Sequence, residues 1–316
     1  MSDLAIRADN LGKRFGDVVA LDGVSFGVEA GTVLGLLGPN GAGKTTAVRM
    51  LTTIIPVDQG RGEVLGIDVA KYPQSVRLRI GLAGQYAAVD EALTVRENLR
   101  LAGRLSHLPN AETEARAEEL LGRFGLSDAA DRSLKTYSGG MRRRLDLAAA
   151  LVHRPPVLFL DEPTTGLDPA ARLDLWAIIA ELVADGTSVL LTTQYLEEAD
   201  RLADHIVVID HGRVIAEGTA TELKGRIGST HIEVNVPIGE VDRARTALAS
   251  VGTPALADTA NGVAIQVPDS GPAVLAAVRA LDAAGLDVEA LAVREPTLDD
   301  VFLELTGHTA EAPTEV

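Results

Sequence analysis

The sequence contains no cysteine, which excludes disulfides, a thiolate metal site and a cysteine nucleophile. Aromatic residues are scarce, at 3% of the chain. Positive charge is also in deficit, because the formal net charge is −16, whereas sequence-independent affinity for nucleic acid or anionic lipid depends on Lys and Arg. We therefore expect no nucleic-acid partner, and we expect any membrane association to run through a specific protein partner.

Long apolar runs are missing as well. No stretch approaches the roughly 18 to 20 apolar residues that span a bilayer, and the start "MSDLAIRADN" has neither a basic leader nor an apolar signal core. We expect the chain to stay in the cytosol. Its 316 residues, 46% of them hydrophobic, suffice for one large domain and one small one.

The first two thirds of the chain predict an α/β fold. Short apolar runs separated by Gly and Asp between Leu4 and Glu29 indicate antiparallel strands. Apolar strands such as "PPVLFLDEP" and "SVLLTT" then alternate with helical segments, which is typical of a parallel sheet covered on both faces. Between about residues 90 and 152 the apolar spacing predicts a helical subdomain.

After about Lys224 shorter strand and helix patterns alternate, and we predict a separate α+β domain there. The expected domains are residues 1–225, residues 226–307 and a solvated tail over residues 308–316. Four residues of the segment "LDDVFLEL" have helical spacing and are expected to form a core face: Leu298, Val301, Phe302 and Leu305.

The segment "GPNGAGKT" predicts a phosphate-binding loop, because it has the required glycines, lysine and hydroxyl and lies between a strand pattern and a helix pattern. Backbone N–H groups and a helix N-terminus would face the anion, Lys44 would reach the outer phosphates, and Thr45 would hold magnesium. A chance match is the alternative. The predicted nucleotide-binding residues are Gly38, Pro39, Asn40, Gly41, Ala42, Gly43, Lys44, Thr45 and Thr46.

Two adjacent carboxylates, Asp161 and Glu162, follow the apolar strand of "VLFLDEP". In nucleoside triphosphatases an acidic residue in this position helps to hold magnesium, and a neighbour near the terminal phosphate can orient or deprotonate water. We therefore assign Asp161 to the metal and Glu162 to catalysis. The alternative is that the pair only caps the next helix.

The segment "YSGGM" stands directly before the helical pattern "RRRLDLAAALV". Ser138, Gly139 and Gly140 would offer a hydroxyl and N–H donors to an anion at the helix start, although most such triplets are simple turns. The arginines at 142–144 are expected to form a solvated helix face, with a contact for acidic groups as the alternative.

Taken together, "GPNGAGKT", "AGQYAAVDEALT", "YSGGMRRR", "VLFLDEPTTGLD" and "LLTTQYLEEAD" occur in an order that resembles the nucleotide-binding subunit of ATP-binding cassette transporters, over roughly Leu4 to Gly225. The resemblance implies a P-loop NTPase cassette fold with an antiparallel β subdomain and a helical signature subdomain. It also implies ATP and Mg²⁺ as cofactors. Two copies would form a head-to-tail dimer in which Ser138, Gly139 and Gly140 contact the nucleotide held by the other copy.

The same resemblance assigns further residues. Gln85 matches the glutamine of a loop that senses magnesium and touches the membrane partner, and Asp168 matches a loop that spans the dimer interface. Phe15 matches the aromatic residue that stacks on adenine, with packing in a small core as the alternative.

Gln194 stands where the family usually has a histidine that contacts the terminal phosphate. Glutamine can donate an N–H to phosphate, but it cannot exchange a proton as an imidazole does or become cationic near neutral pH. Glu162 is then the sole candidate base. The alternative for Gln194 is a polar residue at a helix start.

The segments "TTQYLEEAD", "IDHGRVIAEGT" and "REPTLDDVFLELTG" resemble the ATPase subunits of daunorubicin-resistance-type drug exporters. That resemblance implies a bacterial exporter subunit, peripheral to the cytoplasmic face of the membrane through a separate permease and powering efflux of a drug, antibiotic or lipid-like molecule. DNA-maintenance ATPases would need a long insertion between Thr45 and Ser138, which lie only 93 positions apart (138 − 45). A soluble cassette ATPase that regulates a process other than transport stays open.

Overall fold

The computed structural model describes residues 4–84, 89–227, 230–254, 262–267, 270–294 and 296–306. These residues form two compact units, which divide between Ala220 and Thr221. Residues 308–316, the expected tail, lie outside the described residues.

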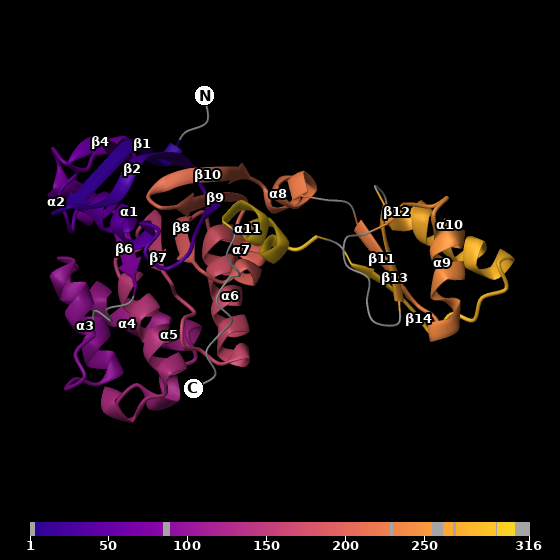
Figure 1. The fold of residues 1–316 in the computed structure, drawn as a ribbon. Helices are drawn as coiled ribbons and strands as arrows, with labels where there is room; N and C mark the ends of the chain where they lie inside the picture. Colours follow the sequence, from indigo (N-terminus) through magenta and orange to yellow (C-terminus); the bar gives the residue numbers. More distant parts are fainter. Residues whose placement is uncertain are drawn as a thin grey trace. The chain divides into compact units, whose positions relative to one another are not determined.

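A six-stranded sheet forms the centre of the first unit, with the strand order β10-β9-β3-β8-β7-β6 (Figure 1). All neighbouring strands in it are parallel except β10, which is antiparallel to β9. Each residue of β3, β7 and β8 is buried, as expected where helices cover both faces. The strands are β3 (Val33–Leu37), β6 (Ile80–Ala83), β7 (Val157–Asp161), β8 (Ser188–Thr193), β9 (His205–Asp210) and β10 (Arg213–Gly218).

A second sheet confirms the predicted antiparallel β subdomain. Its order is β2-β1-β4-β5, and each neighbouring pair is antiparallel. The strands are β1 (Leu4–Phe15), β2 (Val18–Glu29), β4 (Gln59–Val64) and β5 (Ile67–Asp68), and the associated helices are α1 (Lys44–Leu51) and α2 (Pro73–Arg77).

The predicted helical subdomain is also present, and local sequence fixes where its helices begin. Thr94 and Glu97 form a capping box at the start of α3, and the Ser138 hydroxyl accepts from the backbone N–H of Met141 at 3.3 Å at the start of α5. The helical elements are α3 (Val95–Leu105), α4 (Asn110–Arg123), α5 (Gly139–Ala150) and the 3₁₀ turns η1 (Ser127–Ala129) and η2 (Leu134–Thr136).

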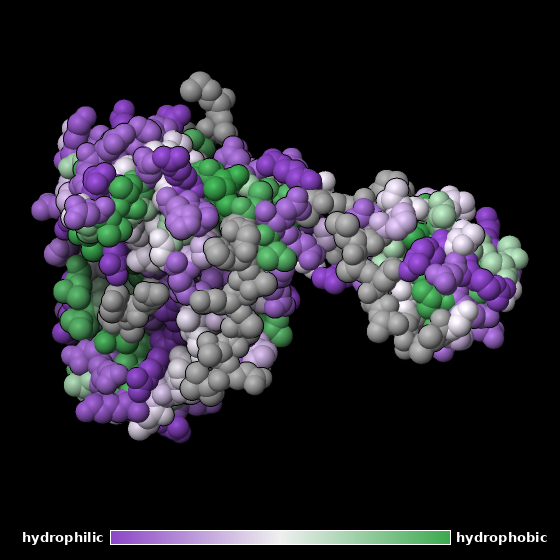
Figure 2. Space-filling model, viewed as in Figure 1, coloured by the Kyte–Doolittle hydropathy of each residue, from purple (hydrophilic) through white to green (hydrophobic). Residues whose placement is uncertain are grey.

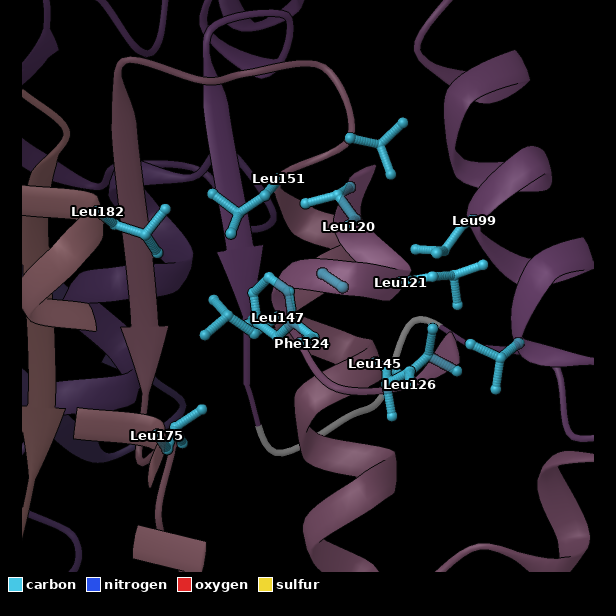
Figure 3. Close-up of a cluster of buried hydrophobic side chains, with 14 of the residues drawn as sticks. Leu99, Leu120, Leu121, Phe124, Leu126, Leu145, Leu147, Leu151, Leu175 and Leu182 are labelled. Atoms are coloured by element: carbon cyan, nitrogen blue, oxygen red, sulfur yellow. The ribbon is translucent and has the colours of Figure 1, made fainter. Parts of the chain in front are cut away.

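One hydrophobic core joins this subdomain to the central sheet. Figure 3 shows leucines of α3, α4, α5 and α6 (Pro169–Ala184) turned into the same cluster. Leu99, Leu120 and Leu145 are fully buried in it. The helices are therefore anchored by apolar burial on the side that also carries β7 and β8. Helix α7 (Leu196–Leu202) follows β8.

The second unit is the predicted small α+β arrangement. Its antiparallel sheet has the order β12-β13-β11-β14, and alternate residues such as Ile232 and Val234 are buried in its core. The elements are α8 (Ala220–Ile227), β11 (Thr230–Asn235), η3 (Ile238–Glu240), α9 (Val241–Leu248), β12 (Thr253–Pro254), β13 (Gly262–Val267), α10 (Ser270–Ala283), β14 (Ala290–Arg294) and α11 (Leu298–Thr306).

The expected core face of α11 is only partly right. Leu298, Val301 and Phe302 are buried, whereas Leu305 is 41% exposed. Helical spacing from Val301 therefore does not by itself bury Leu305, which lies one residue before the end of α11.

Hydrophilic side chains cover much of the visible face in Figure 2, with smaller apolar areas between them. Within the described ranges, no helix combines the length and apolar content needed to cross a bilayer.

Candidate nucleotide-binding and hydrolysis site

The turn between β3 and α1 has the geometry of a phosphate-binding loop. Gly38 and Gly43 have φ of 157° and 111°, and a Cβ on them would lie 2.2 Å from the Ile209 carbonyl oxygen and 2.5 Å from that of Ala20, respectively. Only glycine fits at both positions. Residues 40–46 of the loop line a hollow of about 180 Å³ together with Ala20 and Glu162, so a phosphate group there would face backbone N–H groups and the start of α1.

Lys44, the first residue of α1, places its cation at this hollow. Its side chain is only 4% exposed, and Nζ donates to the carbonyls of Gly38 at 2.7 Å and Pro39 at 3.1 Å. Nζ also lies 3.7 Å from Oε1 of Glu162. The cation is therefore fixed between the loop and a carboxylate, where it can bind phosphate oxygens.

Asp161 at the end of β7 meets the hydroxyl of Thr45. Thr45 Oγ1 donates to Asp161 Oδ1 at 3.1 Å, although the two residues are 116 positions apart in the sequence (161 − 45). A hydroxyl and a carboxylate are hard oxygen donors of the kind that Mg²⁺ prefers, so this pair fits the predicted metal position. The third predicted metal residue, Gln85, lies outside the described residues.

Thr192 on β8 supports both carboxylate residues and was not predicted. Its hydroxyl donates to Asp161 Oδ1 at 2.6 Å, and it accepts from the backbone N–H of Glu162 at 3.1 Å. Thr192 is fully buried. The "LLTTQ" segment offered one indication, since two hydroxyl residues, Thr192 and Thr193, follow the apolar positions of the strand.

Glu162 is 8% exposed and sits at φ 52°, a conformation that non-glycine residues adopt rarely and that costs on the order of 1–3 kcal/mol. Its carboxylate lies beside Lys44 and accepts from Thr165 Oγ1 at 3.4 Å. Glu162 lines the phosphate-loop hollow and a second one of about 290 Å³. A base in this position can reach a water next to the terminal phosphate.

Arg143 of α5 is the second supporting residue that sequence reasoning missed. Its guanidinium donates to four backbone carbonyls: those of Gly84, Asp161 (3.3 Å), Glu162 (2.6 Å) and Pro163 (2.6 Å). The expectation of a solvated face at 142–144 is wrong for this side chain, which is 15% exposed, compared with 38% for Arg142 and 26% for Arg144. Burial lowers the pKa of Arg143 from its usual range, while Asp146 acts in the opposite direction.

The strand register brings Gln194 to the same edge of the sheet. Thr193, the last residue of β8, pairs with Leu37 at the end of β3, so Gln194 lies beside the start of the phosphate loop. Its side chain is half-buried. Ligands of parallel sheets bind at the carboxyl ends of the strands, which fits a role for Gln194 in contacting nucleotide.

The other predicted residues lie on helix starts or strand ends. Phe15, at the end of β1, is 51% exposed with Lys13 Nζ 5.5 Å from its ring centroid, so the ring has free surface for stacking and does not belong to a buried core. Ser138 and Gly139 are exposed and Gly140 half-buried at the start of α5. Asp168 caps α6, since its carboxylate accepts from the N–H of Ala171 at 2.8 Å.

Comparison with known proteins agrees with this geometry. A family model described as ABC transporter matches residues 21–165, and one described as the C-terminal domain of DrrA1-3-like ATP-binding proteins matches residues 218–306. The chain is 54% identical to the daunorubicin resistance ATP-binding protein DrrA2 of Streptomyces coeruleorubidus over 98% of each chain. It is 50% identical to the daunorubicin/doxorubicin resistance protein DrrA of Streptomyces peucetius, over 97% of this chain and 94% of the relative.

A solved ATP-binding subunit of an ABC transporter is 31% identical, with a TM-score of 0.64 over 70% of this chain and 92% of that one. The match to relatives over nearly the whole length, and the phosphate loop with two carboxylates beside it, identify the chemistry as ATP hydrolysis coupled to transport. This chain therefore belongs to the ABC transporter family, as an ATP-binding subunit related to the DrrA proteins.

Proposed function

We propose that this chain powers efflux of a drug, antibiotic or lipid-like molecule through a separate membrane permease. The observation that carries the proposal is the identity of 50% or more, over nearly the whole length, to two proteins named for resistance to daunorubicin or doxorubicin. The chain would be held at the cytoplasmic face of the membrane by that permease. The alternative, a cassette ATPase that regulates a process other than transport, predicts no permease partner.

Within one subunit the residues divide the work. Lys44 and the loop N–H groups bind the phosphates, and the exposed ring of Phe15 stacks on adenine. Thr45 and Asp161 hold Mg²⁺, which when bound neutralises charge on the phosphate oxygens. Glu162 orients and deprotonates the attacking water. Gln194 donates an N–H to the terminal phosphate and so holds it against that water.

Two copies of the chain are proposed to pair head to tail around two ATP molecules. Ser138 and Gly139 are exposed at the start of α5, where a hydroxyl and helix N–H groups can bind the phosphates of a nucleotide held by the other copy. Asp168 would lie at the interface. Binding of ATP closes the dimer and hydrolysis reopens it, and these movements drive the permease.

The proposal is tested in the native cell with doxorubicin as the probe. Deleting the gene should raise accumulation of the fluorescent drug, the parent chain should restore efflux, and Glu162→Gln should fail to restore it at equal protein level. The tagged chain should also copurify with a polytopic membrane protein after mild solubilisation. Unchanged drug accumulation together with purification of the chain without any membrane protein would favour the regulatory alternative.

A further inference from the structure

Arg143 joins helix α5, which begins in the "YSGGM" segment, to the end of the strand that carries Asp161 and Glu162. It stands five residues after Ser138 in α5, and its guanidinium contacts the backbone of the three consecutive residues 161–163 and of Gly84. These contacts bridge three parts of the chain that are distant in sequence: the end of β6, the start of α5 and the end of β7.

The chemistry of these contacts requires arginine. A guanidinium presents five N–H donors in a rigid planar fork, whereas lysine presents one compact ammonium. Arg143 uses all three of its nitrogens: Nε on Pro163, Nη1 on Gly84, and Nη2 on Asp161 and Glu162. Its neighbours contact acidic side chains instead, Arg142 with Glu91 at 2.9 Å and Arg144 with Asp174 at 2.6 Å.

Asp146, one turn further along α5, completes the connection. It is 2% exposed, its Oδ2 lies 3.6 Å from Arg143 Nη1, and it accepts from the backbone N–H of Gly84 at 3.3 Å. Helix α5 therefore holds both backbone polar groups of Gly84, the residue directly before Gln85. The negative charge of Asp146 stabilises the buried Arg143 cation and so opposes the desolvation that lowers the pKa of Arg143.

Glu162 is the residue that gains most from this arrangement. A non-glycine residue at φ 52° persists only where its surroundings determine the backbone. The Glu162 N–H is fixed by Thr192, and the Glu162 carbonyl is fixed by Arg143 at 2.6 Å. Removing Arg143 takes the shorter bond from this carbonyl, which also accepts from the N–H of Thr165 at 3.4 Å, and allows the carboxylate to move away from the phosphate loop.

We propose that Arg143 is a positioning residue for hydrolysis, which makes the placement of Glu162 depend on the placement of α5. A nucleotide that is held by the other copy and contacts Ser138 of this copy would then act on Glu162 of this copy through the Arg143 side chain. The proposed role of Arg143 within one copy depends on the ATPase activity of the chain. It does not depend on the identity of the exported molecule. Only its coupling to the second copy depends on the proposed dimer.

The test compares Arg143→Gln with Arg142→Gln, which removes the same charge from the adjacent, more exposed position of the same helix. With the purified full-length chain and Mg-ATP, Arg143→Gln should lower kcat by roughly ten- to a hundredfold, as expected for a small misplacement of a catalytic group. KM and the affinity for a fluorescent ATP analogue should change less than about twofold, because the phosphate loop itself is intact. Arg142→Gln should match the parent in all three.

Hydrogen exchange of the same samples provides a readout that does not depend on turnover. The N–H of Thr165 bonds to the Glu162 carbonyl at 3.4 Å, so its exchange should become faster in Arg143→Gln and stay at the parent rate in Arg142→Gln. Arg143→Lys, which keeps the charge without the fork, should fold, and its kcat and its exchange at Thr165 should fall between those of Arg143→Gln and the parent.

Equal kcat and equal exchange in the two glutamine variants would overturn the role of Arg143. A parallel rise in KM and loss of ATP-analogue binding would do the same, because it would mean that the change had damaged the whole nucleotide site. A parent chain that binds but does not hydrolyse ATP would count against the assigned ATPase activity, and the exchange measurement would still test Arg143.

Discussion

Thr192 donates its hydroxyl to Oδ1 of Asp161 at 2.6 Å, and the same oxygen accepts from Thr45 at 3.1 Å. One carboxylate oxygen thus receives two hydroxyl donors, from β8 and from α1. The Thr192 oxygen also accepts from the N–H of Glu162. A single buried hydroxyl therefore fixes both the carboxylate that is proposed to hold Mg²⁺ and the backbone of the candidate base.

Replacing Thr192 with valine keeps the shape of the side chain but removes these bonds. Because the Asp161 carboxylate and the Glu162 N–H each lose one partner and keep another, we expect the free energy of unfolding to fall by about 1 kcal/mol, and the Mg²⁺ concentration for half-maximal hydrolysis to rise. Urea denaturation and Mg²⁺ titration of the ATPase measure the two effects. The control is Thr32→Val, whose hydroxyl bonds to an exposed carbonyl. Equal losses in the two variants would contradict the prediction.

Glu162→Gln should stop hydrolysis while leaving ATP binding in place. The amide retains the size of the side chain and its contact with Thr165 but cannot take a proton, and loss of a general base costs on the order of 10²–10⁴ in rate. Single-turnover hydrolysis and equilibrium binding of an ATP analogue separate the two effects. Glu197→Gln, an exposed glutamate on α7, is the matched control. Residual turnover within about threefold of the parent would exclude Glu162 as the base.

Gln194→Ala should weaken hydrolysis more than ATP binding, because Gln194 is proposed to contact the terminal phosphate while the loop of residues 38–46 holds the nucleotide. Gln194→His should also introduce a step in the rate near pH 6.5 that the glutamine of the parent cannot produce at this position. Rates measured from pH 5.5 to 8.5 with a parallel binding assay check both statements. Equal hydrolysis rates in the alanine variant and the parent would overturn this role.

The phosphate loop could be predicted from the sequence because its chemistry is local: Gly38, Gly43, Lys44 and Thr45 lie within eight consecutive positions (45 − 38 + 1). The strands that end at Asp161 and Thr193 could be predicted from their apolar runs. The antiparallel β subdomain and the helical subdomain likewise follow from local spacing.

Arg143 and Thr192 could not be found in this way. Three arginines in succession at the start of a helix look alike in sequence, and which one turns inward depends on how α5 packs against the ends of β6 and β7. Along β8 itself nothing indicates which polar group Thr192 contacts. Its partner, Asp161, is brought opposite by the pairing of β7 with β8. Such contacts depend on tertiary placement, which local patterns do not contain.

Glu198 on α7 is a buried carboxyl with its own dependence on pH. It is fully buried, and Oε1 accepts from Trp176 Nε1 at 2.9 Å. Burial raises the pKa of Glu198, and hydrogen bonds from Thr193 and Trp176 oppose that rise only in part. Because its pKa is higher in the folded than in the unfolded chain, the folded state holds this proton more tightly.

The sign of the effect on stability follows from that difference. The contribution of Glu198 is fully present below the unfolded pKa, about 4.5, and is lost as the pH rises through the higher folded pKa. Glu198→Gln keeps the acceptor for Trp176 and cannot ionise, so its free energy of unfolding relative to the parent should increase from pH 4.5 to pH 8. Urea denaturation at several pH values measures this difference. Glu197→Gln, at an exposed position of the same helix, should show no such trend, and a difference independent of pH in Glu198→Gln would mean that Glu198 is already ionised in the folded chain throughout this range.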